Sequence, residues 1–325
     1  MSSKLHPNLA IDLDAEIERI AQWMRQSLGR QLRKRGCVIA MSGGIDSAVT
    51  AGLCVKAIGP DRVFGLMLPE QDSSSNSTQR GKELMRSLGI QAIEQNISES
   101  LSALGCYKAR DAAIQSVFPT YKPDSWKNKI RITGGLQGQF NRFELVVEDP
   151  KGAQFTEELP LEAYLTIVAA TNYKQRLRKS IEYFHADRLN YAVMGTPNRL
   201  EYKLGFFVKN GDGSADLKPI AHLYKSQVYA MAPKVGVPES ICNATPTTDT
   251  YSLEQGQDEF YFALPYAQMD VAMWCYEKQR SANELAKLIS ISPEQAEFVL
   301  TDIRRKIETT APLHWAGLHL LNTES

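Results

Sequence analysis

The feature that most constrains this chain is a short apolar run that ends at two glycines. Residues 37–41 read Cys-Val-Ile-Ala-Met, and Ser42, Gly43 and Gly44 follow at once. A continuous apolar run is typical of a strand covered on both faces, whereas a strand with one face in water alternates apolar and polar residues. Residues 48–58 then predict a helix that ends at Gly59 and Pro60. The sequence therefore predicts a parallel sheet with helices on both of its faces.

The same alternation continues along the chain, after a first amphipathic helix around residues 17–28. Strands are expected at residues 62–68, 91–97 and 191–194, and helices near residues 79–88, 162–184, 224–235, 260–278, 282–289 and 293–307. Strands that alternate with helices are the pattern of a doubly wound α/β fold, and such folds bind ligands at the carboxyl ends of their strands. The fold class expected is α/β, with a helical C-terminal region.

The alternation breaks between residues 103 and 161, where Lys, Gly, Pro and aromatic residues mix and residues 143–152 read as a strand that enters a turn. We expect an inserted hairpin or lid here, because a structureless loop of this length is unusual in a compact domain. The alternative is that the insertion only adds to the packing of the domain or to a dimer contact. The expected division is residues 1–102 and 162–258 for the α/β domain, 103–161 for the insertion and 259–325 for the helical region.

Composition narrows the class of protein. The 37 Lys and Arg residues balance 37 Asp and Glu residues, so no global charge draws the chain to nucleic acid or to a membrane surface. Five widely spaced cysteines without a CxxC pair favour a reducing compartment. No signal peptide or membrane span is visible, and we expect a cytoplasmic protein. Residues 282–299 superficially resemble a helix-turn-helix, but Glu284, Glu294 and Glu297 would repel DNA.

The turn after the first strand carries the strongest chemical signal. Gly43 and Gly44 allow an anion to approach the backbone, and Ser42, Ser47 and a helix N-terminus supply donors to phosphate oxygens. A carboxylate at Asp46 would repel a phosphate unless a divalent cation lay between them, so Asp46 predicts Mg²⁺ on a nucleotide pyrophosphate. The alternative is that Asp46 only caps the helix.

The run Ser-Gly-Gly-Ile-Asp-Ser-Ala-Val at residues 42–49 resembles the loop of the ATP pyrophosphatases, which have the adenine nucleotide α hydrolase fold. Three later segments resemble the NAD synthetases more closely: Gly-Thr-Pro-Asn-Arg-Leu-Glu at 195–201, residues 205–219, and Leu-Tyr-Lys-Ser-Gln-Val at 223–228. The resemblance covers most of the chain from about Ile17. Because no glutaminase domain precedes the loop, it implies the ammonia-using form, or one fed by a separate amidotransferase.

The resemblance implies a reaction and a set of roles. In NAD synthetases the nicotinate carboxylate of deamido-NAD attacks ATP to form an adenylate, and ammonia displaces AMP. Metal ligands would be Asp46 and Glu201. ATP contacts would be Ser42, Gly43, Gly44, Asp46, Ser47, Arg176, Thr196, Lys225 and Thr247. Deamido-NAD contacts would be Phe206, Lys209, Asp212 and Asp216. The catalytic residues would be Asp46, Lys225 and Asp212, with Asp212 able to accept a proton from the attacking amine. A homodimer is also implied.

The sequence departs from the family pattern in three places. Ile307 and Glu308 stand where many NAD synthetases carry a Lys-Arg pair, the insertion replaces a short connection, and Met67 precedes Leu-Pro where some members have Arg. These departures keep open a related ligase that adenylates a different carboxylate. A non-catalytic nucleotide-binding regulator is the alternative of another class, and the presence of Asp46, Glu201 and Lys225 argues against it.

Overall fold

The computed structural model describes residues 5–133, 142–244, 251–253 and 264–318. Its centre is a parallel sheet of four strands within these residues, in the order β3-β2-β1-β7. The strands are β1 (Cys37–Ala40), β2 (Val63–Met67), β3 (Gln91–Glu94) and β7 (Ala192–Val193). The register pairs Cys37 with Val63 on one side and with Ala192 on the other. The doubly wound α/β fold predicted from the sequence is confirmed.

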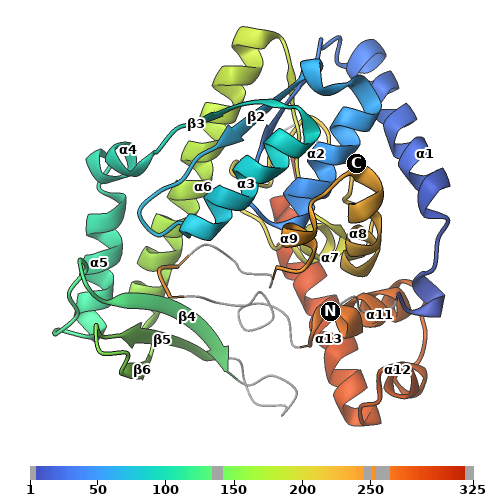
Figure 1. The fold of residues 1–325 in the computed structure, drawn as a ribbon. Helices are drawn as coiled ribbons and strands as arrows, with labels where there is room; N and C mark the ends of the chain where they lie inside the picture. The colour runs from blue at the N-terminus through green and yellow to red at the C-terminus, as the bar shows by residue number, and fades with distance from the viewer. Residues whose placement is uncertain (1–4, 134–141, 245–250, 254–263, 319–325) are drawn as a thin grey trace.

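Helices cover both faces of this sheet (Figure 1). One face packs on α1 (Leu13–Gln26), α2 (Ile45–Ile58), α3 (Ser75–Leu88) and α8 (Lys225–Met231). The other face packs on α4 (Ser98–Ala103), α5 (Cys106–Val117) and α6 (Leu161–Leu189). Neighbours in β1 divide between the two: Ile39 lies in the first core and Val38 in the second. This division explains why the run at residues 37–41 has no polar member.

The insertion folds as more than a hairpin. After α5 come three antiparallel strands in the order β4-β5-β6, namely β4 (Lys127–Thr133), β5 (Arg142–Glu148) and β6 (Gln154–Glu158). The predicted strand near residue 143 is confirmed as β5, whereas α5, β4 and β6 were not foreseen. This sheet packs with α5 against the first half of α6, through a core that includes Ile114, Ile130, Leu145 and Ile167.

The C-terminal region is helical, as predicted. It contains α11 (Tyr266–Glu277), α12 (Ala282–Ile289) and α13 (Pro293–Thr310), and it packs on α7 (Arg199–Leu204) through a separate apolar core. Short helical segments complete the described chain: Pro7–Leu9, Ser27–Gln31, Pro60–Arg62, Ala232–Val235, α9 (Glu239–Cys242) and Ala311–Leu313. The predicted start of the first of these helices, near residue 260, lies outside the described residues. The pair α12 and α13 packs on the molecule through this core, as predicted for a helical pair.

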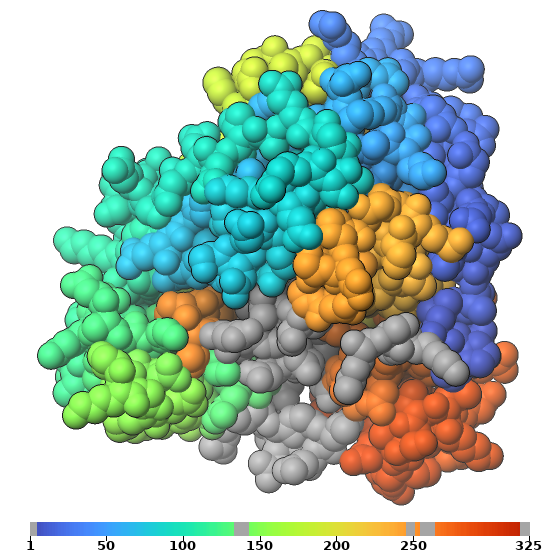
Figure 2. Space-filling model, in the orientation of Figure 1, coloured from blue at the N-terminus to red at the C-terminus, as the bar shows by residue number. Residues whose placement is uncertain are grey.

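The inserted region and the C-terminal helices lie on opposite sides of the lower half of the molecule (Figure 2). Between them, the carboxyl ends of the parallel strands face the same edge of the molecule (Figure 1). Among the described residues, none of the helices combines the length and the apolarity needed to span a bilayer.

Candidate active site

The turn between β1 and α2 has a backbone that fits glycine only. Gly43 has φ of 77°, and a Cβ at this position would collide with the carbonyl oxygen of Ser77 in α3. The turn closes on itself, because the Gly44 N–H donates to Ser42 Oγ at 3.2 Å and Ser47 Oγ donates to the Gly44 carbonyl at 2.9 Å. The N-terminus of α2 therefore follows directly on β1, and helix N-termini carry amide donors and a positive partial charge.

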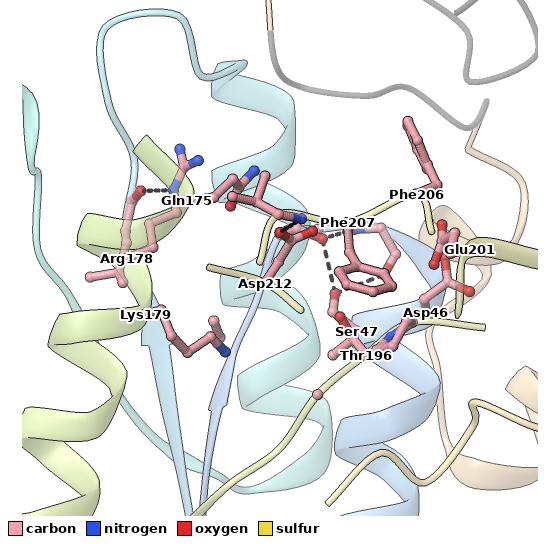
Figure 3. Close-up of a pocket in the computed structure, with 18 of the residues that line it drawn as sticks. Asp46, Ser47, Gln175, Arg178, Lys179, Thr196, Glu201, Phe206, Phe207 and Asp212 are labelled. Atoms are coloured by element: carbon pink, nitrogen blue, oxygen red, sulfur yellow. Dashed lines mark hydrogen bonds between the residues drawn. The ribbon is translucent and has the colours of Figure 1, made fainter. Parts of the chain in front are cut away.

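Two carboxylates, those of Asp46 and Glu201, lie close together at this turn (Figure 3). Lys225 lines the same cavity. Asp46, in the first turn of α2, accepts from Lys225 Nζ and, at 3.2 Å, from Asn198 Nδ2. Asn198 caps α7, and its backbone N–H donates to Glu201 Oε2 at 3.1 Å. The side chain of Lys225 is 2% exposed, and its backbone N–H is held by Asp270 at 3.1 Å. Helices α2, α7 and α8 thus bring Asp46, Glu201 and Lys225 together.

The charges at this point are not balanced by the protein alone. Burial, and then repulsion from Asp46, raise the pKa of Glu201 to about 8. Burial lowers the pKa of Lys225, but the negative charge of Asp46, together with smaller effects of Tyr266 and Glu201, raises it by more in sum, so the lysine stays charged. A divalent cation would relieve the repulsion between the two carboxylates, and Mg²⁺ prefers oxygen ligands. The donor set therefore fits Mg²⁺, with Asp46 and Glu201 as the residues that would hold it.

The protein does not build a closed metal cage. No group of three or more His, Cys, Asp or Glu side chains that could hold a metal occurs in the part of the chain that the structure describes. Mg²⁺ is commonly held by one or two carboxylates, with waters and substrate phosphates completing its shell. Two carboxylates beside a phosphate-binding turn match a cation that arrives with a nucleotide.

The turn opens into a cavity of about 700 Å³. One side is formed by the turn, Asp46 and Glu201, and the other by α6, from which Gln175, Arg178 and Lys179 project (Figure 3). Arg178 donates to the Leu68 carbonyl at 3.2 Å, which ties α6 to the end of β2. Lys179 is paired with Glu182 at 2.7 Å. Thr196, which follows β7, also lines the cavity.

The loop after α7 forms a third side of the cavity and carries three predicted substrate contacts, Phe206, Lys209 and Asp212. Asp212 accepts from the Val208 N–H at 2.8 Å. Desolvation by the surrounding protein raises the pKa of Asp212. That hydrogen bond and the positive charge of Lys179 lower the pKa by less, so the net shift is upward. Arg176 donates to the Lys209 carbonyl at 3.2 Å, so the predicted anion contact of α6 reaches the same loop.

The C-terminal segment closes over this loop. Lys209 Nζ donates to the Pro312 carbonyl at 3.0 Å, and Leu313 lines the cavity. Ile307, at the position where the resemblance noted in the sequence implies a cation, packs against the C-terminal apolar core. Lys306 pairs with Asp302 at 2.7 Å. The described tail therefore adds apolar contacts and a backbone carbonyl at the place where the resemblance noted in the sequence implies basic residues.

Asp216 is a predicted substrate contact that is not among the described residues lining the cavity. It accepts from the Val193 N–H at 2.7 Å and so supports the end of β7. Thr247, a predicted ATP contact, lies outside the described residues. Their predicted roles stay predictions.

Other residues of the site were missed by the sequence analysis. Asn198 touches both predicted metal ligands and is fully buried. The pattern Asn-x-x-Glu at 198–201 is a capping-box signature and could have drawn attention to it. From the inserted sheet, Ile132 and Phe143 reach the cavity, and their sequence carries no signal of that position.

A phosphate-binding turn, an acidic pair and a buried lysine at the carboxyl end of a parallel sheet define a nucleotide-binding α/β protein equipped for phosphate chemistry. Residues 16–133 and 121–308 match the family model described as NAD synthase. The chain belongs to this family of carbon–nitrogen ligases, and the resemblance seen in the sequence is confirmed.

Individual relatives extend over nearly the whole chain. An NH(3)-dependent NAD(+) synthetase of Rhizobium meliloti (strain 1021) is 52% identical over 307 residues, which cover 94% of this chain and 91% of that protein. Among solved structures, an NMN synthetase from Francisella tularensis gives a TM-score of 0.65 at 23% identity, covering 95% of this chain and 99% of the other. An NH3-dependent NAD synthetase from Campylobacter jejuni gives 0.61 at 20% identity, covering 95% and 100%. The two structures share the fold.

Proposed function

We propose that the protein forms NAD from deamido-NAD, ammonia and ATP, releasing AMP and pyrophosphate. The observation that carries the proposal is the joint placement of Asp46, Glu201 and Lys225 beside the Gly43–Gly44 turn. This group suits a triphosphate with its Mg²⁺. Asp46 comes from the run that resembles the ATP pyrophosphatase loop, and Glu201 and Lys225 come from two of the segments that resemble NAD synthetases. The near-complete relative at 52% identity, an NH(3)-dependent NAD(+) synthetase, supports the same reaction.

In the first step a carboxylate oxygen of the nicotinate attacks the α-phosphorus of ATP, and the bond to pyrophosphate breaks. Negative charge grows on the leaving pyrophosphate, so donors already held in place lower the barrier. The turn amides and Ser47 would bind the pyrophosphate, and the charged Lys225 would neutralise part of its charge. Mg²⁺, when bound by Asp46 and Glu201, would supply further charge neutralisation.

In the second step ammonia attacks the acyl carbon of the adenylate, and the carbon–oxygen bond to AMP breaks. The nitrogen must lose one proton to leave a neutral amide. Asp212 faces the cavity and its pKa is raised, which brings it closer to the range in which a carboxylate can accept and pass on a proton. We assign this role to Asp212, in agreement with the sequence prediction.

The test supplies purified protein with ATP, Mg²⁺, ammonium and deamido-NAD, and follows NAD by a coupled dehydrogenase and AMP by chromatography. Formation of NAD and AMP in equal amounts is expected. AMP release that depends on ammonium but yields no NAD from deamido-NAD would contradict the proposal.

A second candidate is an amide ligase for a different carboxylate. It is favoured by Ile307, which packs into the C-terminal core where related proteins place a cation for the substrate. The same assay distinguishes the two, because a panel of other carboxylates would then support AMP release while deamido-NAD would not.

The partner proposed is a second copy of the chain. One face of α6 carries an exposed stripe of large apolar side chains at helical spacing, with Leu161, Leu165, Tyr173 and Phe184 from 38% to 71% exposed. Arg176, on the same stripe, also lines the cavity, which would place the site near a dimer interface. Sedimentation of the Leu165→Glu variant tests this, since loss of a dimer is expected.

The remaining partners follow from the reaction. Ammonia is proposed to be used directly or supplied by a separate amidotransferase, and no nucleic acid or membrane takes part. The reaction is proposed to run in the cytoplasm, where the five thiols at Cys37, Cys54, Cys106, Cys242 and Cys275 would stay reduced.

A further inference from the structure

The inserted region contributes an apolar surface to the cavity. Ile132 of β4 and Phe143 of β5 are paired across the inserted hairpin, and Tyr164 and Val168 of α6 lie beside them. The rings of Phe143 and Tyr164 stack at 4.2 Å between centroids, with 27° between their planes. We call these four residues the aromatic wall. All four line the same cavity as Asp46 and Glu201, the acidic pair.

The aromatic wall is held in place from behind and from the side. Behind it lie buried residues of the inserted core, including Ile114 and Ile167. At its side a buried ion network joins α5 to the loop after β2: Arg110 pairs with Asp72, and Lys174 of α6 contacts Asp72 at 2.5 Å and Glu70 at 3.1 Å. An inserted region fixed at both places presents a formed surface to the cavity.

The cavity-facing side of α6 changes character along its length. It begins with Tyr164 and Val168, continues with Asn172 and Gln175, and then carries the cations Arg176, Arg178 and Lys179, the last of which pairs with Glu182 at the far end. Tyr164 and Lys179 are separated along the helix axis by about 22 Å at 1.5 Å per residue. A nucleotide has the same order of parts, because its base is aromatic, its ribose carries hydroxyls and its phosphates are anionic. The helix thus offers stacking, then hydrogen bonds, then positive charge.

One nucleotide is already accounted for at the other side of the cavity, where the turn and the acidic pair suit the phosphates of ATP. The reaction proposed above needs a second molecule with a base and phosphates, and it has to reach the ATP α-phosphate with its nicotinate carboxylate. The part of the dinucleotide beyond the nicotinate mononucleotide is an AMP unit, and it would extend away from the reacting centre. The aromatic wall and the graded side of α6 match that unit.

We propose that the aromatic wall binds the AMP half of the dinucleotide, with its adenine stacked on the Phe143–Tyr164 pair. The inserted region then makes the enzyme select a dinucleotide over a mononucleotide carboxylate. The inference rests on the proposed function, since it assumes deamido-NAD as the substrate.

The test compares Phe143→Leu and Tyr164→Leu with the wild type, because leucine keeps an apolar side chain but cannot stack. Steady-state kinetics are measured with deamido-NAD, with nicotinate mononucleotide and with varied ATP. Loss of one stacking partner is expected to raise the KM for deamido-NAD roughly tenfold. The kcat/KM for the mononucleotide is expected to stay within about twofold, because this substrate has no AMP half to stack on the wall. The KM for ATP is expected to stay within about twofold, because ATP binds at the other side of the cavity.

A matched control comes from the same sheet. Phe155 of β6 stacks on Trp126 at 5.8 Å and is 44% exposed, and it is not among the described cavity-lining residues. Phe155→Leu should therefore leave the kinetic constants for all three substrates unchanged. Thermal melting by circular dichroism shows which variants are folded, and calorimetric titration of deamido-NAD without ATP should show weaker binding for both wall variants.

The outcomes separate the two proposals. If the wild type forms NAD but the folded wall variants keep its KM for deamido-NAD, the aromatic wall has no role in binding and only this inference is overturned. If the KM for ATP rises instead, the wall holds the adenine of ATP and the inference is wrong. If the wild type forms no NAD from deamido-NAD, both the proposed function and the inference are overturned.

Discussion

Two regions meet at the cavity, and they are built in different ways. The parallel sheet delivers polar groups from the ends of its strands and helices, each with a named hydrogen-bond partner, as Asp46 has in Asn198 and Lys225. The inserted region delivers apolar side chains from the surface of a packed core: Phe143 packs against that core, and Ile132, paired with it across the hairpin, also lines the cavity. The comparison teaches that reaction chemistry is tied to the strand ends, whereas substrate recognition is open to added segments.

The largest expected effect belongs to the parallel-sheet region. Asp46→Ala should lower the rate of AMP release on the order of 10³-fold, because the triphosphate would lose both a metal ligand and the partner that orients Lys225. The rate is measured by chromatography of AMP, with the exposed Asp61→Ala as control. An active variant that has only lost about 1 kcal/mol of stability would mean that Asp46 is simply a helix cap.

The next prediction concerns the link between the two regions. Arg110→Met should reduce the free energy of unfolding by about 3 kcal/mol, because it removes one of the two cations that pair with the buried carboxylate of Asp72, Lys174 being the other. Its control is Arg131→Met in the inserted sheet, where the pair with Glu144 is 42% and 25% exposed and should be worth at most about 1 kcal/mol. Urea unfolding measures both. Equal losses would show that the buried network does not fasten the inserted region.

A third test compares a glycine in each region. Gly43 and Gly152 both have positive φ, of 77° and 84°, but only at Gly43 would a Cβ meet the backbone of a neighbouring helix. Gly152→Ala should cost about 1 to 2 kcal/mol from the backbone alone, and Gly43→Ala about 3 kcal/mol or more. Thermal melting gives the two values. ATP binding should weaken only in the Gly43 variant, and weakening in both would contradict the assignment of the turn.

The smallest effect is expected at a residue that acts through others. Asn198→Ala should lower kcat/KM about 10- to 100-fold, since the side-chain amide holds the Asp46 carboxylate and caps the helix that carries Glu201, without touching a substrate. The Mg²⁺ concentration for half-maximal rate should rise as well, which loss of stability alone would not produce. The exposed Asn243→Ala is the control, and an unchanged Mg²⁺ requirement in the Asn198 variant would rule out the positioning role.

The sequence predicted the parts of the fold that follow from local patterns. The apolar run at residues 37–41 and its turn became β1 and the glycine turn that leads into α2, and the periodic residues 282–289 became α12 with the predicted bounds. Helix α2 begins at Ile45 rather than at residue 48, because the turn leads into it directly. Local patterns served well where each residue's environment is set by its own element.

The sequence could not predict contacts that depend on packing between distant segments. The strand β6 is exposed along its whole length, so it lacks the apolar alternation that marks a strand. Asn198 acquires its place between two carboxylates only when α7 packs beside α2, and Lys209 meets Pro312 only after the tail folds back. Such contacts join residues whose separation along the chain gives no periodic signal.

The pairing of Cys37 with both Val63 and Ala192 bears on how the protein is made. β2 leaves the ribosome soon after β1, but the two-residue β7 follows only when the whole inserted region has been synthesised. The sheet of the nascent chain therefore stays incomplete until β7 has been synthesised. Asp46 and Glu201 cannot come together before α7 has left the ribosome. Because the entropy of loop closure grows only with the logarithm of loop length, the insertion delays this last pairing more than it weakens the finished sheet.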